Sequence, residues 1–450
     1  MDAFNENSNE QQAQQPMGCL HRFSKTIKVV IIGLLILLLM IPMFMIENLI
    51  SERGRTQEEA IDEVSEKWSL AQTITGPYLN LQYPVVTENN GEKKVSIKDL
   101  ILFPDELTIN GQLKTEILKR SIYEVNVYQS ELTLKGSFSS EELKKSRIDM
   151  EQLQFDRAAI CLNLTDMRGI SEQISITLGD SVYIFEPGMD NRGIDNTGVH
   201  AIANLSELKQ NKKLPYEIKI KLKGSQSLNF IPLGKTTRVD LKANWNTPSF
   251  TGNYLPNNRN ITEKEFSAQW QVLNLNRNYS QVMADYNTSN IKDIENSSFG
   301  VNFKIPVEQY QQSMRSAKYA ILIILLTFGV IFFTEIMNKT RIHALQYLLV
   351  GLALCLFYSL LLSFSEHVGF NPAYLLSSAL TIILVGGYMF GITKKKKPSL
   401  IMSGLLGILY LYIFVLIQLE TFALLAGSLG LFIILAMVMY FSKKIDWFNE

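Results

Sequence analysis

The stretch SLIMSGLLGILYLYIFVLIQLETFALLAGSLGLFIILAMVMYF, from Ser399 to Phe441, decides the fold class of this chain. Its 43 residues are mostly apolar, and only Gln418 and Glu420 interrupt them strongly. As a single helix the stretch would be roughly 65 Å long, about twice the ~30 Å hydrocarbon layer of a membrane. We therefore expect two membrane-spanning helices, Ser399–Leu419 and Thr421–Phe441, that turn at Gln418–Thr421.

Four further apolar runs have a similar length. Each is close to the ~20 residues that a helix needs to cross the hydrocarbon layer. The runs are Val29–Ile46, Tyr319–Met337, Ala344–Phe364 and Pro372–Ile392. The sequence thus predicts six spans, with a long hydrophilic segment between the first span and the other five.

The first run has an alternative interpretation as a cleaved secretory signal, because basic residues precede it. No small-x-small cleavage site follows the run, and Pro42 and the bulky segment Met43–Ile46 stand where cleavage would occur. We favour an anchor that stays in the protein.

Basic residues between the runs predict the orientation of the spans. They precede the first run and follow the second, fourth and sixth, whereas Ser365–Asn371 and Gln418–Glu420 contain no Lys or Arg. By the positive-inside rule both termini lie in the cytoplasm and Glu47–Ala317 lies outside it. The bases concerned are Arg22, Lys25, Lys28, Lys339, Arg341, Lys394, Lys395, Lys396, Lys397, Lys443 and Lys444.

The whole-chain composition hides this division. The 450 residues include 43 Lys and Arg and 43 Asp and Glu, so the formal net charge is zero, which argues against a nucleic-acid-binding protein. Three cysteines are too few for a disulfide scaffold. Charged residues make up 66 of the 271 positions from Glu47 to Ala317, as in a soluble domain, but only ten of the 124 from Lys318 to Phe441.

The outer segment has the patterns of a β-rich domain. An amphipathic helix over Ser51–Gln72, ended by Gly76-Pro77, comes first. Polar and apolar residues then alternate, as in a strand with one buried face. The expected strands are Leu79–Val86, Ser96–Phe103, Ile122–Tyr128, Ala158–Leu164, Gln173–Leu178, Ser181–Phe185, Tyr216–Lys223, Thr237–Lys242 and Gln269–Leu275, with glycines 91, 111, 136, 179, 224 and 234 between them. We expect a large antiparallel sheet or sandwich in which Cys161 is a buried thiol.

Several blocks resemble the CreD family of bacterial inner-membrane proteins, in the family's order from about Pro42 to Gly391. One departure is Arg120-Ser121, where the family usually has Arg-Gly. The resemblance implies a role in cell-envelope integrity and tolerance of envelope stress, with no defined enzymatic activity and no catalytic residues to carry over. The blocks are Glu52-Arg53, Glu59-Ala60-Ile61, Glu63-Val64, Trp68, Gln72, Gly76-Pro77, Lys119–Val125, Gly136–Phe138, Trp245–Gly252, Leu255-Pro256, His343–Gly351 and Phe357–His367.

The sequence lacks the usual signatures of catalysis. No His-Glu-x-x-His, Cys-x-x-Cys, Gly-x-Ser-x-Gly, phosphate-loop or dinucleotide motif occurs. Of four histidines only His200 lies in the outer segment, where we expect a plain loop histidine rather than part of a Ser-His-Asp triad. We therefore expect a protein that is not an enzyme, with no catalytic residues, no metal site and no cofactor. Carboxylates are abundant, so a cell-wall hydrolase stays an alternative.

Two groups of residues are candidates for interaction or coupling. No span has a charge at its centre, and Glu335, Glu366, His367 and Glu420, near span ends, are expected to stay hydrated among the lipid headgroups. A more specific hypothesis is that Glu366 and His367 form a hydrogen-bonded cluster that contacts the outer domain.

The second group lies in the loop-like stretch Trp245–Asn258, where Trp245, Phe250 and Tyr254 are the candidate residues. A loop of this length often binds a partner. It could equally cap the edge of the sheet.

Together the patterns predict an α+β membrane protein with six transmembrane helices and a large β-rich periplasmic domain. Its expected function is envelope integrity or stress response through periplasmic binding or scaffolding. The alternatives are a transporter or lipid-handling protein and, third, a periplasmic hydrolase. Expected partners are membrane lipids and an envelope protein or cell-wall component, but no nucleic acid.

The expected location is the bacterial inner membrane. The expected parts are a disordered cytoplasmic tail (1–28), the first transmembrane helix (29–46), the periplasmic domain (47–317), a five-helix transmembrane bundle (318–441) and a cytoplasmic tail (442–450).

Overall fold

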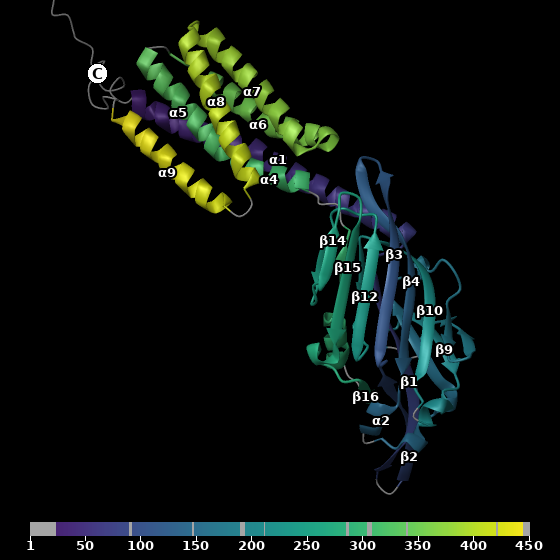
Figure 1. Cartoon of the computed structure of the whole chain (residues 1–450). Helices are drawn as coiled ribbons and strands as arrows, with labels where there is room; N and C mark the ends of the chain where they lie inside the picture. The colour runs from purple at the N-terminus through teal and green to yellow at the C-terminus, as the bar shows by residue number, and fades with distance from the viewer. Residues whose placement is uncertain are drawn as a thin grey trace, which may run out of the picture. The chain divides into compact units, whose positions relative to one another are not determined.

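The structure, a computed structural model, divides the chain into two compact units. The helical unit comprises Met1–Thr56 and Val307–Glu450, and the β unit comprises Gln57–Pro306 (Figure 1). The structure describes residues 24–89, 92–145, 148–189, 194–210, 212–284, 288–303, 308–338, 341–419 and 422–443. The predicted N-terminal tail, including Cys19, falls almost wholly outside these residues.

Helix α1 (Ser24–Trp68) is one continuous helix of 45 residues that contains Pro42. It includes both the predicted first span and most of the predicted amphipathic helix. The expected end at Gly76-Pro77 is wrong, because the helix stops at Trp68 and Gly76-Pro77 lies inside strand β1 (Gln72–Asn89). Tertiary contacts explain the earlier end, and a local sequence pattern does not show them.

Those contacts centre on Asp166 and Arg168. The backbone N–H of Leu70 donates to Asp166 Oδ2 over 2.9 Å, and Arg168 Nη1 donates to the carbonyl of Glu66 over 2.6 Å. Arg168 and Asp166 also form an ion pair with an Nε–Oδ1 distance of 3.0 Å. Arg168 therefore satisfies a carbonyl that the C-terminus of a helix leaves without a partner, and Asp166 binds the backbone just after the helix.

The helical unit contains α1 up to Thr56 and a series of helices after the β unit. Within the described residues, α1, α5, α6, α7 and α8 are long and apolar enough to cross a membrane. Five of the six predicted spans are thus confirmed as apolar helices of sufficient length. The sixth stays a prediction, because α9 has a shorter apolar stretch, Leu424–Met437. The helices are α4 (Glu308–Lys318), α5 (Ala320–Asn338), α6 (Ala344–Val368), α7 (Phe370–Thr393), α8 (Lys396–Gln418) and α9 (Ala423–Ser442).

One face of α1 packs in the helical unit. Leu35, Leu39, Met43 and Ile50 are its buried apolar residues, and their spacing of four, four and seven positions places them on one side of a helix. A Cβ added to Gly351 of α6 would lie only 2.1 Å from Leu39 Cδ1. The glycine therefore makes room for the leucine, and the first span packs directly against α6.

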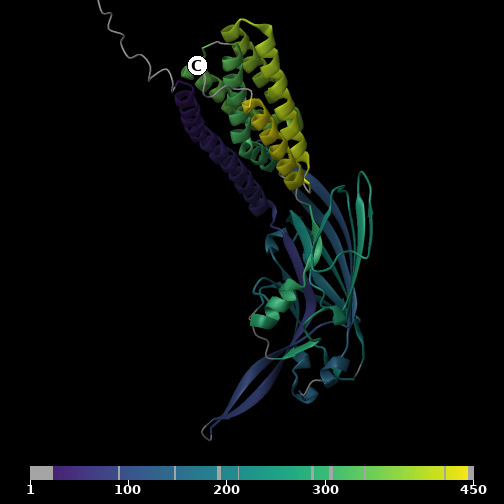
Figure 2. The same cartoon turned by 90° about the vertical axis from the view of Figure 1, so that its left-hand side faces the viewer.

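The β unit consists of two sheets with a common hydrophobic core (Figures 1 and 2). One has the order β13-β17-β11-β1-β5-β9-β8, with β2 between β1 and β16, and the other β14-β15-β12-β3-β4-β10-β6-β7. The predicted β-rich domain is confirmed, and of the two expected forms, a large antiparallel sheet or a sandwich, the two sheets correspond to the sandwich, with β1–β11 and β12–β3 paired in parallel.

All nine predicted strands are present, Ala158–Leu164 with its predicted ends and the other eight with shifted ends, and Cys161 is buried. The strands after β1 are β2 (Glu92–Leu102), β3 (Glu106–Arg120), β4 (Tyr123–Phe138), β5 (Ala158–Leu164), β6 (Ser175–Leu178), β7 (Ser181–Ile184), β8 (Glu186–Pro187), β9 (Gly198–Ala203), β10 (Leu214–Ser225), β11 (Ser227–Phe230), β12 (Thr236–Ala243), β13 (Ser249–Gly252), β14 (Asn258–Ile261), β15 (Phe266–Leu273), β16 (Val282–Ala284) and β17 (Phe299–Asn302). Short helices α2 (Glu141–Lys145) and α3 (Thr288–Asn296) join some of them.

Three glycines that were expected between strands lie within them. Gly111 is in β3, Gly136 in β4 and Gly224 in β10. A Cβ on Gly136 would lie 1.8 Å from the carbonyl oxygen of Glu106 in the neighbouring strand. This glycine permits close approach of two backbones, which a sequence pattern cannot distinguish from a turn.

The Asp166 contacts predict a pH-dependent stability of the β unit. Burial raises the pKa of Asp166, but hydrogen bonds from Arg168 and Leu70 outweigh burial, so its pKa is lower than usual. A lowered pKa contributes stability above the unfolded value of about 3.9, and this stability is lost as the pH falls through the folded pKa. Asp166→Asn should cost about 1–3 kcal/mol near neutral pH, with a difference from wild type that shrinks below about pH 4.

Thermal unfolding followed by tryptophan fluorescence measures this difference, since Trp68, Trp245 and Trp270 lie in the β unit. Exposed Asp293→Asn is the control. If the stability difference between Asp166→Asn and the wild type stays constant from pH 7 to pH 3, the proposed ionic contact is contradicted.

Candidate functional site

A partly buried ion pair joins the first span to the helices that follow the β unit. Lys28 of α1 pairs with Glu335 of α5, and Lys28 Nζ also donates to the carbonyl of Ile342 over 3.0 Å. The other donors to Glu335 are the backbone N–H of Ile342, 3.1 Å from Oε1, and the hydroxyl of Tyr347, 3.1 Å from Oε2. Both carboxylate oxygens therefore have hydrogen-bond partners, as a buried charge requires.

This arrangement corrects the expectation that Glu335 is hydrated among headgroups. Glu335 is only 8% exposed, and its partners come from three segments of the chain. Sequence reasoning treated Lys28 only as a topology signal. The pairing could not be found from spacing, because the two residues are 307 positions apart.

A second carboxylate cluster surrounds Glu366, near the end of α6. The hydroxyl of Tyr310, in α4, donates to Glu366 Oε1 over 3.0 Å, and Arg53 Nε of α1 lies 3.9 Å from the same oxygen. The Glu366 side chain is 13% exposed, whereas His367 is exposed. The structure thus brings Glu366 together with Arg53 and Tyr310, but no contact with His367 is part of the cluster. These contacts are all within the helical unit.

The positions of the two clusters along α1 match a membrane span. Lys28 and Arg53 are 25 residues apart, which corresponds to ~37 Å of helix, slightly more than the ~30 Å hydrocarbon layer. Each cluster holds one carboxylate of the later helices against one base of α1. The arrangement can fix both the depth and the rotation of α1.

Aromatic rings pack the interior between α6, α7 and α8. Phe357 lies 4.5 Å from Tyr410 and 5.4 Å from Tyr374 between ring centroids, and the Tyr374 hydroxyl donates to the carbonyl of Tyr410 over 2.9 Å. Among the described residues the buried hydroxyl of Tyr358 has no hydrogen-bond partner. This aromatic packing offers little support for the polar passage that a transporter requires.

The candidate aromatic residues of Trp245–Asn258 pack against the core of the β unit. Phe250 belongs to edge strand β13, with its ring 5.9 Å from Phe266, and Tyr254 lies 5.8 Å from Phe299. Trp245 is half-buried and donates from Nε1 to the carbonyl of Thr247 over 3.0 Å. The stretch is therefore not one long loop, and its position corresponds to the alternative in which it caps the sheet edge.

The end of the β1–β2 hairpin extends beyond its neighbouring strands, as Figure 2 shows. Strand β5 pairs with β1 only up to Asn80, and β16 pairs with β2 only at Leu100–Leu102. Val86 is 59% exposed, and its register partner Val95 is 61% exposed. Ile97, two positions from Val95 on the same face, is 62% exposed. Sequence reasoning placed both strands but missed this exposed face, because it could not show where the neighbours end.

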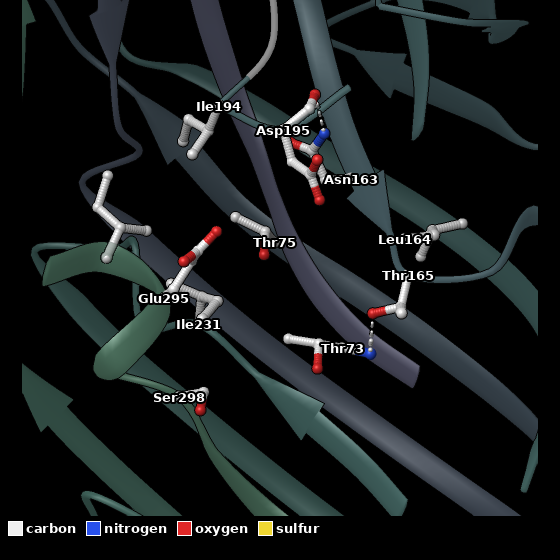
Figure 3. Close-up of a pocket in the computed structure, with 11 residues that line it drawn as sticks. Thr73, Thr75, Asn163, Leu164, Thr165, Ile194, Asp195, Ile231, Glu295 and Ser298 are labelled. Carbon is white, nitrogen blue, oxygen red and sulfur yellow. Dashed lines mark hydrogen bonds between the residues drawn. The ribbon is translucent and has the colours of Figure 1, made fainter. Parts of the chain in front are cut away.

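A small polar pocket of ≈ 210 Å³ lies beside β1 and β5 (Figure 3). It brings together two carboxylates from different elements, Glu295 of α3 and Asp195 of the loop before β9, together with Ser298. Asp195 accepts hydrogen bonds from its own loop, from the N–H of Asn196 over 2.6 Å and the hydroxyl of Thr197 over 3.2 Å. The remaining lining residues are Thr73, Thr75, Asn163, Leu164, Thr165, Ile194, Ile231 and Ile294.

His200 is not a loop histidine, as expected from the sequence, but part of strand β9. It is 6% exposed, and its Nδ1 lies 2.7 Å from the carbonyl oxygen of Gly188. His200 is not among the residues that line the polar pocket.

Comparison with known proteins gives two matches over nearly the whole chain. Residues 24–448 match the profile of the family described as "Inner membrane protein CreD". The Inner membrane protein CreD of Escherichia coli (strain K12) is 32% identical over 420 residues, which cover 92% of this chain and 91% of that protein. These matches agree with the resemblance that the sequence blocks carry.

The Glu366 cluster predicts unequal effects for two neighbouring substitutions. Glu366→Gln removes the charge that Tyr310 and Arg53 contact, and should lower the free energy of unfolding by about 1–2 kcal/mol. His367→Gln should change it by less than about 0.5 kcal/mol, since His367 is exposed. Thermal unfolding of the detergent-solubilised protein, followed by helical circular dichroism, gives both values. Equal losses from the two variants would contradict the assignment.

Proposed function

This chain belongs to the CreD family of inner membrane proteins, and on that premise we propose that it supports cell-envelope integrity as a non-enzymatic scaffold. The helical unit anchors the protein in the inner membrane. The β unit lies in the periplasm and binds another envelope component. The end of the β1–β2 hairpin, defined by Pro84–Asn89 and Glu92–Asp99, is the binding surface.

The charge pattern supports the proposed orientation. Lys28 precedes the first apolar run, and Lys394–Lys397 lie between α7 and the body of α8, as the positive-inside rule requires of cytoplasmic segments. The six-span arrangement then puts both termini in the cytoplasm. It also puts the chain between α1 and α4, which contains the β unit, on the periplasmic side.

The exposed hairpin is the observation that favours a binding function. Six residues from Pro84 to Asn89 extend over ~20 Å, and an isolated two-stranded ribbon of this kind is only marginally stable in water. Val86, Val95 and Ile97 form an exposed apolar face on it. Apolar faces and strand edges that a fold leaves open are typical interaction surfaces. We infer a protein partner that covers the apolar face or adds a strand to the hairpin.

The alternative of a periplasmic hydrolase would require the pocket lined by Asp195, Glu295 and Ser298 to be the active site. Its volume of ≈ 210 Å³ is below the ~300–1,000 Å³ of ordinary ligand pockets. Asp195 already accepts hydrogen bonds from its own loop, and no histidine or cysteine is among the described residues that line the pocket. These features favour a binding role over catalysis.

In-cell photocrosslinking tests the binding surface. A photoreactive residue at Val86 or Ile97 should give a discrete crosslinked protein, because both side chains are exposed on the hairpin face. The matched control is Leu275, which is 88% exposed elsewhere in the β unit. Val86→Asp with Val95→Asp should abolish the crosslink from Ile97 and lower tolerance of envelope stress at unchanged protein level. The proposal fails if hairpin and control positions give the same products.

A further inference from the structure

A groove at one end of the helical unit has the properties of a lipid site. It lies between the first turns of α5, the last turns of α8 and the first turns of α9, and its volume is ≈ 440 Å³. The lining is almost wholly apolar, and its polar atoms belong mainly to Lys318, Tyr319 and Tyr412. The apolar lining residues are Ile321, Leu322, Leu325, Leu416, Gly427 and Leu431.

A tyrosine spacer between α8 and α9 borders this groove. The hydroxyl of Tyr412 donates to the carbonyl of Ala426 over 2.9 Å. A Cβ on Gly430 would lie 1.8 Å from that hydroxyl, so glycine at this position leaves room for the tyrosine. Gly427, one turn earlier, has no atom within 4 Å of an added Cβ. The space beside Gly427 is therefore open and is not filled by a neighbouring side chain.

The surroundings determine what can fill this space. The groove is formed by helices of a membrane protein, and at hydrocarbon depth an apolar space excludes water and is filled by hydrocarbon. Its volume lies within the ~300–1,000 Å³ of ordinary ligand pockets. Lys318, the last residue of α4, is exposed at the rim beside the first turn of α5. An ammonium group beside an acyl-chain groove complements an anionic lipid headgroup.

We propose that this groove binds one anionic phospholipid. One acyl chain lies between α5, α8 and α9, and the headgroup phosphate contacts the ammonium group of Lys318. The site is independent of the hairpin surface proposed above. It gives a lipid-binding role to Lys318, a base at a span end that the positive-inside rule does not explain.

Native mass spectrometry of the full chain tests the site, with phosphatidylglycerol and phosphatidylethanolamine as probes. Gly427→Leu places a side chain in the open space and should reduce the retained phosphatidylglycerol about tenfold. Gly404→Leu is the matched control, because Gly404 is exposed on α8 and also has no atom within 4 Å of an added Cβ, but it does not line the groove. The control should retain phosphatidylglycerol like the wild type.

Lys318 variants test the headgroup contact without filling the groove. Lys318→Gln should remove the preference for phosphatidylglycerol over phosphatidylethanolamine, and Lys318→Arg should keep it. Equal retention of phosphatidylglycerol by wild type and Gly427→Leu would overturn the groove as the binding site. A preference that persists in Lys318→Gln would overturn the headgroup assignment.

Discussion

The ion pair between Lys28 and Glu335 is the contact on which the architecture of the helical unit depends. The first span is separated from the other helices by the whole β unit, so no short connection can hold it in register. A carboxylate buried in this way is stable only with its partners, and Lys28, Ile342 and Tyr347 supply them. The pair therefore specifies where α1 packs as well as contributing to its packing. Arg53, 25 residues further along α1, pairs with Glu366 in the same way, with a more exposed base.

Helix packing between the Lys28 and Arg53 ion pairs depends on shape rather than on charge. Apolar side chains gain little hydrophobic free energy on leaving lipid, so close contact of helices depends on small residues and shape. Leu39 against Gly351 is such a contact, and Tyr412 against Gly430 is another. Glycine thus serves opposite purposes in the two units: it admits a side chain between helices, and at Gly136 it admits a neighbouring backbone between strands.

Local patterns predicted the elements well because hydrophobic length and alternation are local properties. They predicted Ala158–Leu164 as a strand with the ends that the structure has, and five apolar helices of membrane length. They failed where a distant contact decides the local structure. Asp166 and Arg168 bind the backbone at the end of α1, and the close approach of the Glu106 carbonyl requires a glycine at position 136 within a strand. His200, expected in a loop, lies in strand β9. Of the candidate interaction residues, Glu366 has specific partners, whereas Trp245, Phe250 and Tyr254 pack against the core. The exposed hairpin face was missed because exposure depends on where neighbouring strands stop.

The scaffold account requires the β unit and its hairpin to be on the periplasmic side of the inner membrane. Alkaline phosphatase fusions, active only outside the cytoplasm, test this requirement directly when joined after Gly91 and after Lys397. We expect an active fusion after Gly91, which follows β1 in the sequence, and an inactive one after Lys397. An inactive, stably produced fusion after Gly91 together with an active one after Lys397 would contradict the orientation and, with it, the proposed binding function.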